Sequence, residues 1–329
     1  MKLHCIPILS ALFTSLVCFS NPATKISDNS PSSGIVIRWN DCEQTIDGFG
    51  IAQAGWAKEL FAFKNRKQVM DKMFGNDGLR LNILRGEIFP HYWENKEDKD
   101  FNLNDDINIE LCDSEFNNKS DDLLRRGQLW LTLEAKNKYH INKLVFSTWS
   151  APAWMKSNGK VSNGKLKPEC YQDFANYLAA FYKAYKSKGI TPYAISPSNE
   201  PGYAAPWNSS LWTADEMGKF ITSNLGPTFQ KENIPAKIIF GENPLWSVVM
   251  PQLKMVSSKD FTDTILQDYP EIKKFNLIAA GHGYSLSPDI MPIKVDKEYL
   301  KTPIIPFDAA EKAHIPVWIT EISDVTPLD

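Results

Sequence analysis

Two glutamates, Glu200 and Glu321, each follow a short apolar run that predicts a buried strand, at residues 193–195 and 317–319. In a parallel (β/α)8 barrel the carboxyl ends of all strands meet at one face. Two carboxylates gathered there could hydrolyse a glycosidic bond, because one can protonate the leaving oxygen while the other attacks the anomeric carbon. A single strand-end glutamate is more often a helix cap or an ion-pair partner, so this prediction depends on the pair.

Apolar runs of this kind recur along the chain and alternate with helical patterns. Residues 169–188 carry an apolar stripe and are followed by Gly189, which predicts a helix, and residues 213–216 have the form of a helix-capping box. Strands separated by helices indicate a parallel sheet with right-handed crossovers. The predicted strands lie at residues 46–50, 79–84, 144–146, 191–195, 238–240, 277–280 and 317–319.

We therefore expect an α/β fold class, a (β/α)8 TIM barrel over residues 46–329 that stops before its eighth strand. Only a short segment follows Glu321, too short for another helix and strand. A barrel that lacks one unit leaves two unpaired sheet edges. Two explanations stay open at this point: the chain is a fragment of a longer protein, or its sheet is open.

The segment before the barrel resembles an export signal followed by a linker. Residues 1–20 combine Lys2 with a short apolar stretch and then small or polar residues, as in a cleaved signal peptide. Lipid attachment through Cys18 is a weaker alternative, because Leu16 and Val17 before it lack the small side chain of a lipoprotein signal. Residues 21–33 are rich in Ser, Pro and Asn and predict a linker. We expect an exported protein, extracellular or periplasmic, without a membrane span.

Composition narrows the function classes. The 329-residue chain has a net charge of −3 and is 43% hydrophobic, which suggests neither disorder nor binding to nucleic acid. The cysteines beyond the signal, Cys42, Cys112 and Cys170, are an odd and sparse set that does not make a disulfide framework. No His or Cys spacing is typical of a metal site, so we predict neither a metal nor a cofactor. Ten tryptophans suit sugar stacking and core packing equally.

Four motifs together resemble glycoside hydrolase family 30, a family of retaining (β/α)8 enzymes. They are Ile-Asp-Gly-Phe-Gly at 46–50, Trp-Ser-Ala-Pro-Ala-Trp-Met-Lys at 149–156, Ser-Asn-Glu-Pro at 198–201 and Trp-Ile-Thr-Glu at 318–321. The second is the most specific, and the resemblance covers about residues 35–325. The family packs a β-sandwich side domain against its barrel, so the resemblance assigns residues 34–45 to a strand of that domain. Most of the side domain and the eighth βα unit have no counterpart here.

The resemblance gives the two glutamates distinct roles. Glu200 matches the general acid/base and Glu321 the nucleophile, which in a retaining enzyme lie about 5 to 5.5 Å apart. Arg85 follows the second predicted strand, where its guanidinium could hold Glu321 ionised or instead form a surface ion pair. Asn199 matches the residue that hydrogen-bonds the sugar 2-hydroxyl, although it could simply close a turn. Tyr284 could donate its hydroxyl to Glu321.

Further side chains near the strand ends are candidates for contacts with the sugar, and packing explains each of them about equally well. Trp149 and Trp154 would wall the sugar subsite, while Tyr203 and Trp207 would lie on the leaving-group side. His282 is either a substrate contact or a structural histidine. Two more glutamates near strand ends are reserve carboxylates, should either main assignment fail: Glu87 and Glu242.

We expect a monomeric retaining glycoside hydrolase, an O-glycosyl hydrolase that cleaves a β-linked polysaccharide or oligosaccharide. The residues at 49–54 and 151–154 favour a xylan-type substrate, with β-1,6-galactan and β-1,6-glucan as alternatives within the family. Two other hypotheses stay open. One is an inactive or unstable fragment that binds glycans without cleaving them, and the other is a barrel completed by a second copy of the chain.

Overall fold

The computed structural model describes residues 38, 40–42, 44–53, 56–93, 96–97, 127–247, 255–284 and 305–322. The chain divides into two units, Met1–Asp47 and Gly48–Asp329, and the second carries the sheet and helices. The predicted signal peptide and linker, residues 1–33, lie outside the described residues, so export stays a prediction. Half of the predicted side-domain strand at 34–45 also lies outside them, and its described residues form no strand.

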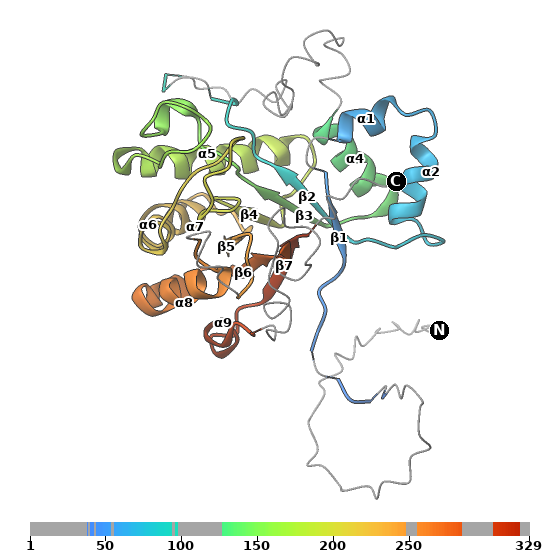
Figure 1. Cartoon of the computed structure of the whole chain (residues 1–329). Coiled ribbons are helices and arrows are strands. Elements are labelled where there is room, and N and C mark those ends of the chain that lie inside the picture. Colours follow the sequence, from blue (N-terminus) through green and yellow to red (C-terminus); the bar gives the residue numbers. More distant parts are fainter. Residues whose placement is uncertain are drawn as a thin grey trace, which may run out of the picture. The chain divides into compact units, whose positions relative to one another are not determined.

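Seven parallel strands form one sheet in chain order, which confirms the expected α/β class with barrel topology (Figure 1). Each strand pairs in parallel with the next, as β-helix-β units require. The sheet is a nearly closed barrel. Within the described residues, the first and last strands each have one strand neighbour and do not pair with each other. The strands are β1 (Gly50–Ala52), β2 (Ile83–Glu87), β3 (Lys143–Ser147), β4 (Ala194–Ser196), β5 (Lys237–Gly241), β6 (Leu277–His282) and β7 (Val317–Glu321).

Helices flank the strands, with α5, α6 and α8 on one side of the view in Figure 1 and α1, α2 and α4 on the other. Three 3₁₀ turns, Ala153–Met155, Pro168–Cys170 and Pro270–Lys274, and a π-helical turn, Ile221–Leu225, complete the described helical segments. The α-helices are α1 (Ala57–Ala62), α2 (Arg66–Phe74), α4 (Gln128–Tyr139), α5 (Tyr171–Ser187), α6 (Ala214–Phe220), α7 (Gly226–Lys231), α8 (Ser258–Asp268) and α9 (Asp308–Lys312). Among the described residues, none of these helices has the length and hydrophobicity needed to cross a bilayer.

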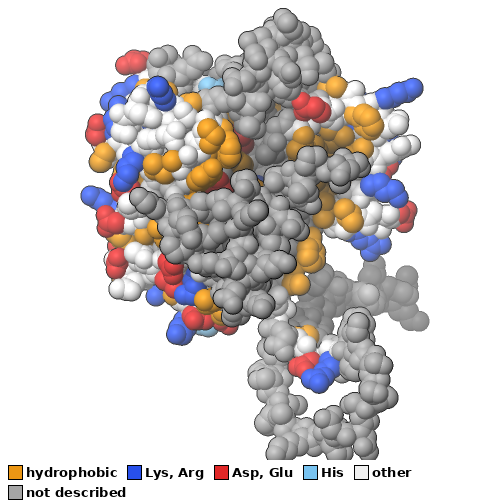
Figure 2. Space-filling view, in the orientation of Figure 1, with side chains coloured by type: hydrophobic (Ala, Val, Ile, Leu, Met, Phe, Trp, Pro, Cys, Tyr) orange, Lys and Arg blue, Asp and Glu red, His pale blue; other side chains and the backbone are white. Residues whose placement is uncertain are grey.

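The two faces of the sheet pack against different partners, because successive side chains of a strand point to opposite sides. On β3, Leu144 and Phe146 join the large core formed with the helices. Val145 between them packs instead with Ile239 and Ile278 in a small cluster that consists mainly of strand residues. Such a cluster is what fills the inside of a barrel. Figure 2 shows charged side chains of both signs mixed over the outer surface of the described part.

Helix α5 confirms the apolar stripe read from the sequence. Its buried face includes Phe174, Phe181 and Tyr185, and the Phe181 ring centroid lies 5.0 Å from that of Phe146 on β3. The chain then turns at Gly189, whose φ of 81° lies in the left-handed region that glycine adopts without steric cost. The capping box before α6 is also confirmed, since the side chains of Thr213 and Glu216 each bond the other residue's backbone amide.

The first two strands lie further along the chain than their apolar patterns predicted. Residues 79–81 do not extend into β2 but bond back to α2: the amide of Leu79 donates to Lys72 O at 2.8 Å, and Arg80 is left-handed with φ 53°. Leu79 is accordingly 72% exposed. Arg85 is therefore the third residue of β2 and not its end. Similarly, β1 begins only at Gly50, after the amide of Phe49 has bonded the Asn82 side chain.

Candidate active site

Backbone hydrogen bonds tie the ends of β3, β4 and β5 together at the carboxyl face of the barrel. The amide of Thr148 donates to Ser196 O at 3.0 Å, and the amide of Asn199 donates back to Thr148 O at 2.7 Å. The amide of Glu200 then donates to Glu242 O at 3.0 Å. The turn that carries Glu200 is therefore held from two neighbouring strand ends.

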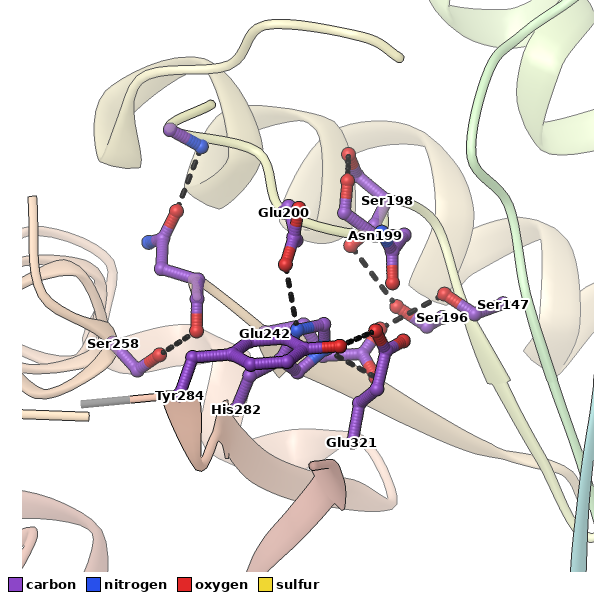
Figure 3. Close-up of polar contacts among 12 residues, drawn as sticks. Ser147, Ser196, Ser198, Asn199, Glu200, Glu242, Ser258, His282, Tyr284 and Glu321 are labelled. Carbon is purple, nitrogen blue, oxygen red and sulfur yellow. Dashed lines mark hydrogen bonds and ion pairs between the residues drawn. The ribbon is translucent and has the colours of Figure 1, made fainter. Parts of the chain in front are cut away.

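Glu200 and Glu242 both have left-handed backbones, with φ of 49° and 41°. Such conformations cost non-glycine residues about 1–3 kcal/mol and persist only where the surroundings enforce them, as the strand-end bonds do here. Glu200 is buried, with 7% of its surface exposed. Its Oε1 lies 3.0 Å from Nδ1 of His282, toward which it points in Figure 3.

A register irregularity in the last strand pair aligns His282 with Glu321. The pairing of β6 with β7 shifts between Gly281 and His282, so that His282 lies opposite Glu321. Irregularities of this kind re-aim side chains and are frequent beside active sites. The amide of Gly283 donates to Glu321 O at 2.8 Å and continues the attachment beyond the strand end.

Two side-chain donors hold the Glu321 carboxylate. Nη1 of Arg85 donates to Oε2 at 2.6 Å, and the Tyr284 hydroxyl donates to Oε1 at 2.5 Å, the contact expected for each residue from the sequence (Figure 3 shows the tyrosine). Burial opposes ionisation of Glu321, but the charges of Arg85 and His282 and the hydrogen bonds from Tyr284 and Arg85 outweigh it. Together they lower the pKa of Glu321 below its ordinary value of 4.5. Glu321 is thus held as the ionised carboxylate that a nucleophile requires.

The two sequence-predicted catalytic carboxylates lie side by side. One carboxylate oxygen of Glu200, one of Glu321 and a ring nitrogen of His282 all lie within 4.8 Å of one another. The same three donors could in geometric terms bind a cation. However, the positively charged Arg85 guanidinium already pairs with Glu321 and would repel a metal cation. The donor set is therefore better suited to acid–base and nucleophilic chemistry than to holding a metal.

Arg85 links the two strand ends that carry the glutamates. Its Nη2 donates to Oδ1 of Asn199 at 2.7 Å and to Oε1 of Glu242 at 3.3 Å, while Nη1 bonds Glu321. Burial opposes its charge, but Glu242 and Glu321 outweigh that effect and raise the pKa of Arg85. Since arginine can only donate, the Asn199 oxygen must face it, and the amide nitrogen points away from Arg85.

The aromatic candidates differ in their surroundings. Trp149 is half-buried, and the Arg85 guanidinium carbon lies 4.8 Å from its ring centroid, a cation–π contact beside Glu321. Trp154 packs against the main core and donates its Nε1 to the carbonyl of Trp93 at 3.2 Å. Tyr203 and Trp207 form an edge-to-face pair with centroids 6.2 Å apart, and Trp207 is 41% exposed. Trp207 is thus the most exposed of the four aromatic candidates.

Sequence reasoning underrated Glu242, which it kept only as a reserve carboxylate, and it missed Ser147 and Asn243. Ser147 ends β3 and donates to Oε2 of Glu242 at 2.9 Å. The Asn243 carbonyl accepts the His282 amide, and its side chain accepts the Gly202 amide at 2.7 Å. The signal that could have found all three is their position at the ends of buried strands. The other reserve carboxylate, Glu87, is buried at the end of β2.

Comparison with known proteins gives concordant results. The family model of the glycosyl hydrolase family 30 TIM-barrel domain matches residues 46–274. The chain is 30% identical over 251 residues to the Caenorhabditis elegans protein named "Putative glucosylceramidase 3", with 73% of this chain and 45% of that protein covered.

Two solved structures share the fold. The endo-β1,6-glucanase BT3312 superposes with a TM-score of 0.63 at 22% identity, covering 85% of this chain and 58% of that one. The catalytic domain of the family 30 xylanase C from Talaromyces cellulolyticus gives 0.57 at 23% identity, covering 74% and 54%. The chain thus spans about half the length of the proteins it matches. The family match over most of the described barrel leads to one conclusion: the chain belongs to glycosyl hydrolase family 30.

Proposed function

We propose that the chain hydrolyses a β-linked glycan with retention of anomeric configuration. Glu321 is the nucleophile and Glu200 the general acid/base. The observation that carries the proposal is the approach of the two carboxylates to within 4.8 Å between oxygens, at the ends of β4 and β7. A short separation of this kind suits direct attack by a carboxylate, whereas an inverting enzyme needs about 6.5–9.5 Å to admit water.

The first step uses the two glutamates in opposite protonation states. A Glu321 oxygen attacks the anomeric carbon and forms a glycosyl ester, while the bond from that carbon to the leaving oxygen breaks. Glu200 gives its proton to the leaving oxygen. Arg85 and Tyr284 keep Glu321 ionised before the attack, and His282 orients Glu200 by its contact with Oε1.

The second step reverses these roles. Glu200, now ionised, accepts a proton from water as the water oxygen attacks the anomeric carbon. The ester bond breaks, and Glu321 returns to its ionised form with the sugar released in the original configuration. The Asn199 amide nitrogen is available to bond the sugar 2-hydroxyl, a contact that strengthens in the transition state.

Polysaccharides are the first substrates to consider. The two structural neighbours are an endo-β1,6-glucanase and a xylanase, and the sequence favoured a xylan-type substrate. The curated relative is named for glucosylceramide, a glycan attached to a lipid. These three substrate types all contain a β-linked sugar, so the same reaction at Glu200 and Glu321 would cleave each of them. The side chains around the site would then select the substrate.

The test is hydrolysis of glucuronoxylan, arabinoxylan, β-1,6-galactan, β-1,6-glucan and glucosylceramide by the chain, beside a Glu200→Gln variant. We expect one substrate to be cleaved, and Glu200→Gln to lower kcat on it by about 10²–10⁴-fold, the usual contribution of a general acid/base. Proton NMR of the first product formed should show the starting anomer. A folded chain that cleaves none of the panel, or a first product of inverted configuration, would contradict the proposal.

A further inference from the structure

A third carboxylate, Glu242, lies beneath the two catalytic ones and takes no part in the proposed reaction. It follows β5 and has no exposed surface. Its Oε2 accepts the Ser147 hydroxyl at 2.9 Å and its Oε1 accepts Arg85 Nη2 at 3.3 Å. Nε2 of His282 lies 4.0 Å from the same Oε1, beyond hydrogen-bonding distance. Glu242 therefore lies close to both Arg85 and His282.

Each of those two neighbours contacts one catalytic carboxylate. Arg85 extends from Glu242 to Glu321, where the Nη1–Oε2 distance is 2.6 Å. His282 extends from Glu242 to Glu200, where the Nδ1–Oε1 distance is 3.0 Å. Glu242 is thus one side chain removed from the nucleophile and from the acid/base at once. Its backbone adds a third link, because its carbonyl accepts the Glu200 amide.

The geometry of arginine explains why this arrangement fixes the nucleophile. The guanidinium is planar, and its N–H groups point in set directions, so acceptors bound on different edges leave it a single orientation. Arg85 uses Nη1 for Glu321 and Nη2 for Asn199 and Glu242. Removing the Glu242 acceptor leaves Nη2 with Asn199 alone and takes away a buried negative charge beside the guanidinium, so the plane is held less firmly against Glu321.

A fully buried carboxylate is costly to keep in a fold, because its desolvation is repaid only by close partners. An apolar residue at position 242 would avoid that cost. The left-handed φ of 41° adds backbone strain at the same residue. Both the buried charge and the left-handed backbone disfavour glutamate here, which points to a role in function and not in packing.

We propose that Glu242 is a positioning residue for the nucleophile: its carboxylate holds Arg85 against Glu321. This inference rests on the proposed function for its kinetic consequences, but its geometric part does not. It gives the reserve carboxylate of the sequence a role other than acid, base or nucleophile.

The experiment compares Glu242→Ala, which removes both acceptor oxygens, with Glu242→Gln, which keeps one acceptor and loses the charge. We expect kcat per active site to fall by about 10²-fold in Glu242→Ala, the scale of a roughly 1 Å misplacement of a catalytic group, and by less in Glu242→Gln. KM should change little. Active sites are counted by covalent trapping with a 2-deoxy-2-fluoro glycoside of the sugar that the wild-type chain cleaves, so loss of folded protein does not enter kcat.

The matched control is Glu232→Gln, which removes a partly exposed carboxylate at the end of α7 that pairs with Lys183 on α5. It should leave kcat unchanged. A double-mutant cycle with Arg85→Lys should be non-additive, because part of the effect of Glu242 passes through Arg85. Crystal structures of wild type and Glu242→Ala should show Arg85 Nη1 leave hydrogen-bonding distance of Glu321.

Wild-type kcat per active site in Glu242→Ala, or an Arg85 that stays on Glu321 without Glu242, would overturn the proposal. Should Glu242→Ala not fold, Glu242→Gln and Ser147→Ala carry the same comparison, with a smaller drop in kcat expected in each. A wild-type chain that cleaves no glycan would defeat the proposed function alone. The crystal structures would then still decide whether Glu242 positions Arg85.

Discussion

The two proposed catalytic carboxylates lie in opposite structural settings. Glu200 follows β4, a central strand between β3 and β5 whose three residues are all buried. Glu321 ends β7, which has a single strand neighbour within the described residues and no fully buried residue. The side chain of Glu200 is 9% exposed, whereas that of Glu321 is 21% exposed.

The difference is reflected in how each residue is held. Glu200 is fixed by its backbone, through the strand-end bonds and a left-handed turn. Glu321 is fixed at its carboxylate, by Arg85 from β2 across the barrel and by Tyr284 from the loop after β6. A catalytic group on a less enclosed strand can therefore be made as precise as a central one, provided that side-chain donors replace the enclosure.

Removing the Glu321 carboxylate should have the largest effect. Glu321→Ala leaves Arg85 and Tyr284 in place but deletes the nucleophile, so kcat should fall by about 10⁴-fold or more. Added azide should restore turnover, because it can enter the space left by the carboxylate, and the glycosyl azide formed should have inverted configuration. Wild-type turnover in Glu321→Ala would show that Glu321 is not the nucleophile.

Removing one donor from Glu321 should have an intermediate effect, confined to the less enclosed carboxylate. Tyr284→Phe deletes a hydrogen bond to a charged group, worth about 1.5 kcal/mol or about tenfold in kcat/KM. Because this bond helps to lower the pKa of Glu321 and the ionised form is the active one, its loss raises that pKa. The acidic limb of the kcat/KM profile should move to higher pH. A profile that stays in place would mean that Tyr284 does not control ionisation.

The smallest effect should appear in stability against pH. The folded-state pKa of Glu321 is depressed below 4.5, so ionised Glu321 contributes stability that is fully present above that value and is lost as the pH falls through the depressed pKa. In Glu321→Gln this loss should be missing. Urea unfolding of both proteins at pH 7 and at steps below 4.5 measures it, and the stability gap between them should shrink with acid. A constant gap would contradict the coupling.

Much of the site could be predicted because several of its functional residues lie in short, contiguous sequence motifs. Glu200, Asn199 and Glu321 lie in motifs directly after apolar strands, and these motifs indicated the family that the family model confirms. Arg85 and Tyr284 were found because few side chains at strand ends can hold a carboxylate. The parallel order of the strands followed from their alternation with helices, and the structure confirms it.

What the sequence could not show depends on contacts between distant residues. Glu242 and Arg85 are 157 positions apart, and only closure of the barrel brings them together. The displaced start of β2 has a similar cause. Leu79 and Leu81 alternate like a strand, but they bond back to α2 through Lys72 and Met73 and leave the sheet to residues further on. A local sequence pattern shows neither the contact of Glu242 with Arg85 nor the residue at which β2 begins.

The left-handed backbones of Glu200 and Glu242 have a consequence for engineering. A programme that selected only for thermal stability would favour glycine or asparagine at both positions, because either tolerates a positive φ better than glutamate does. Such replacements would give a sturdier barrel with a dismantled site. Consensus or stability-guided redesign of this chain should therefore hold these two positions constant and seek its gains in the outer helices.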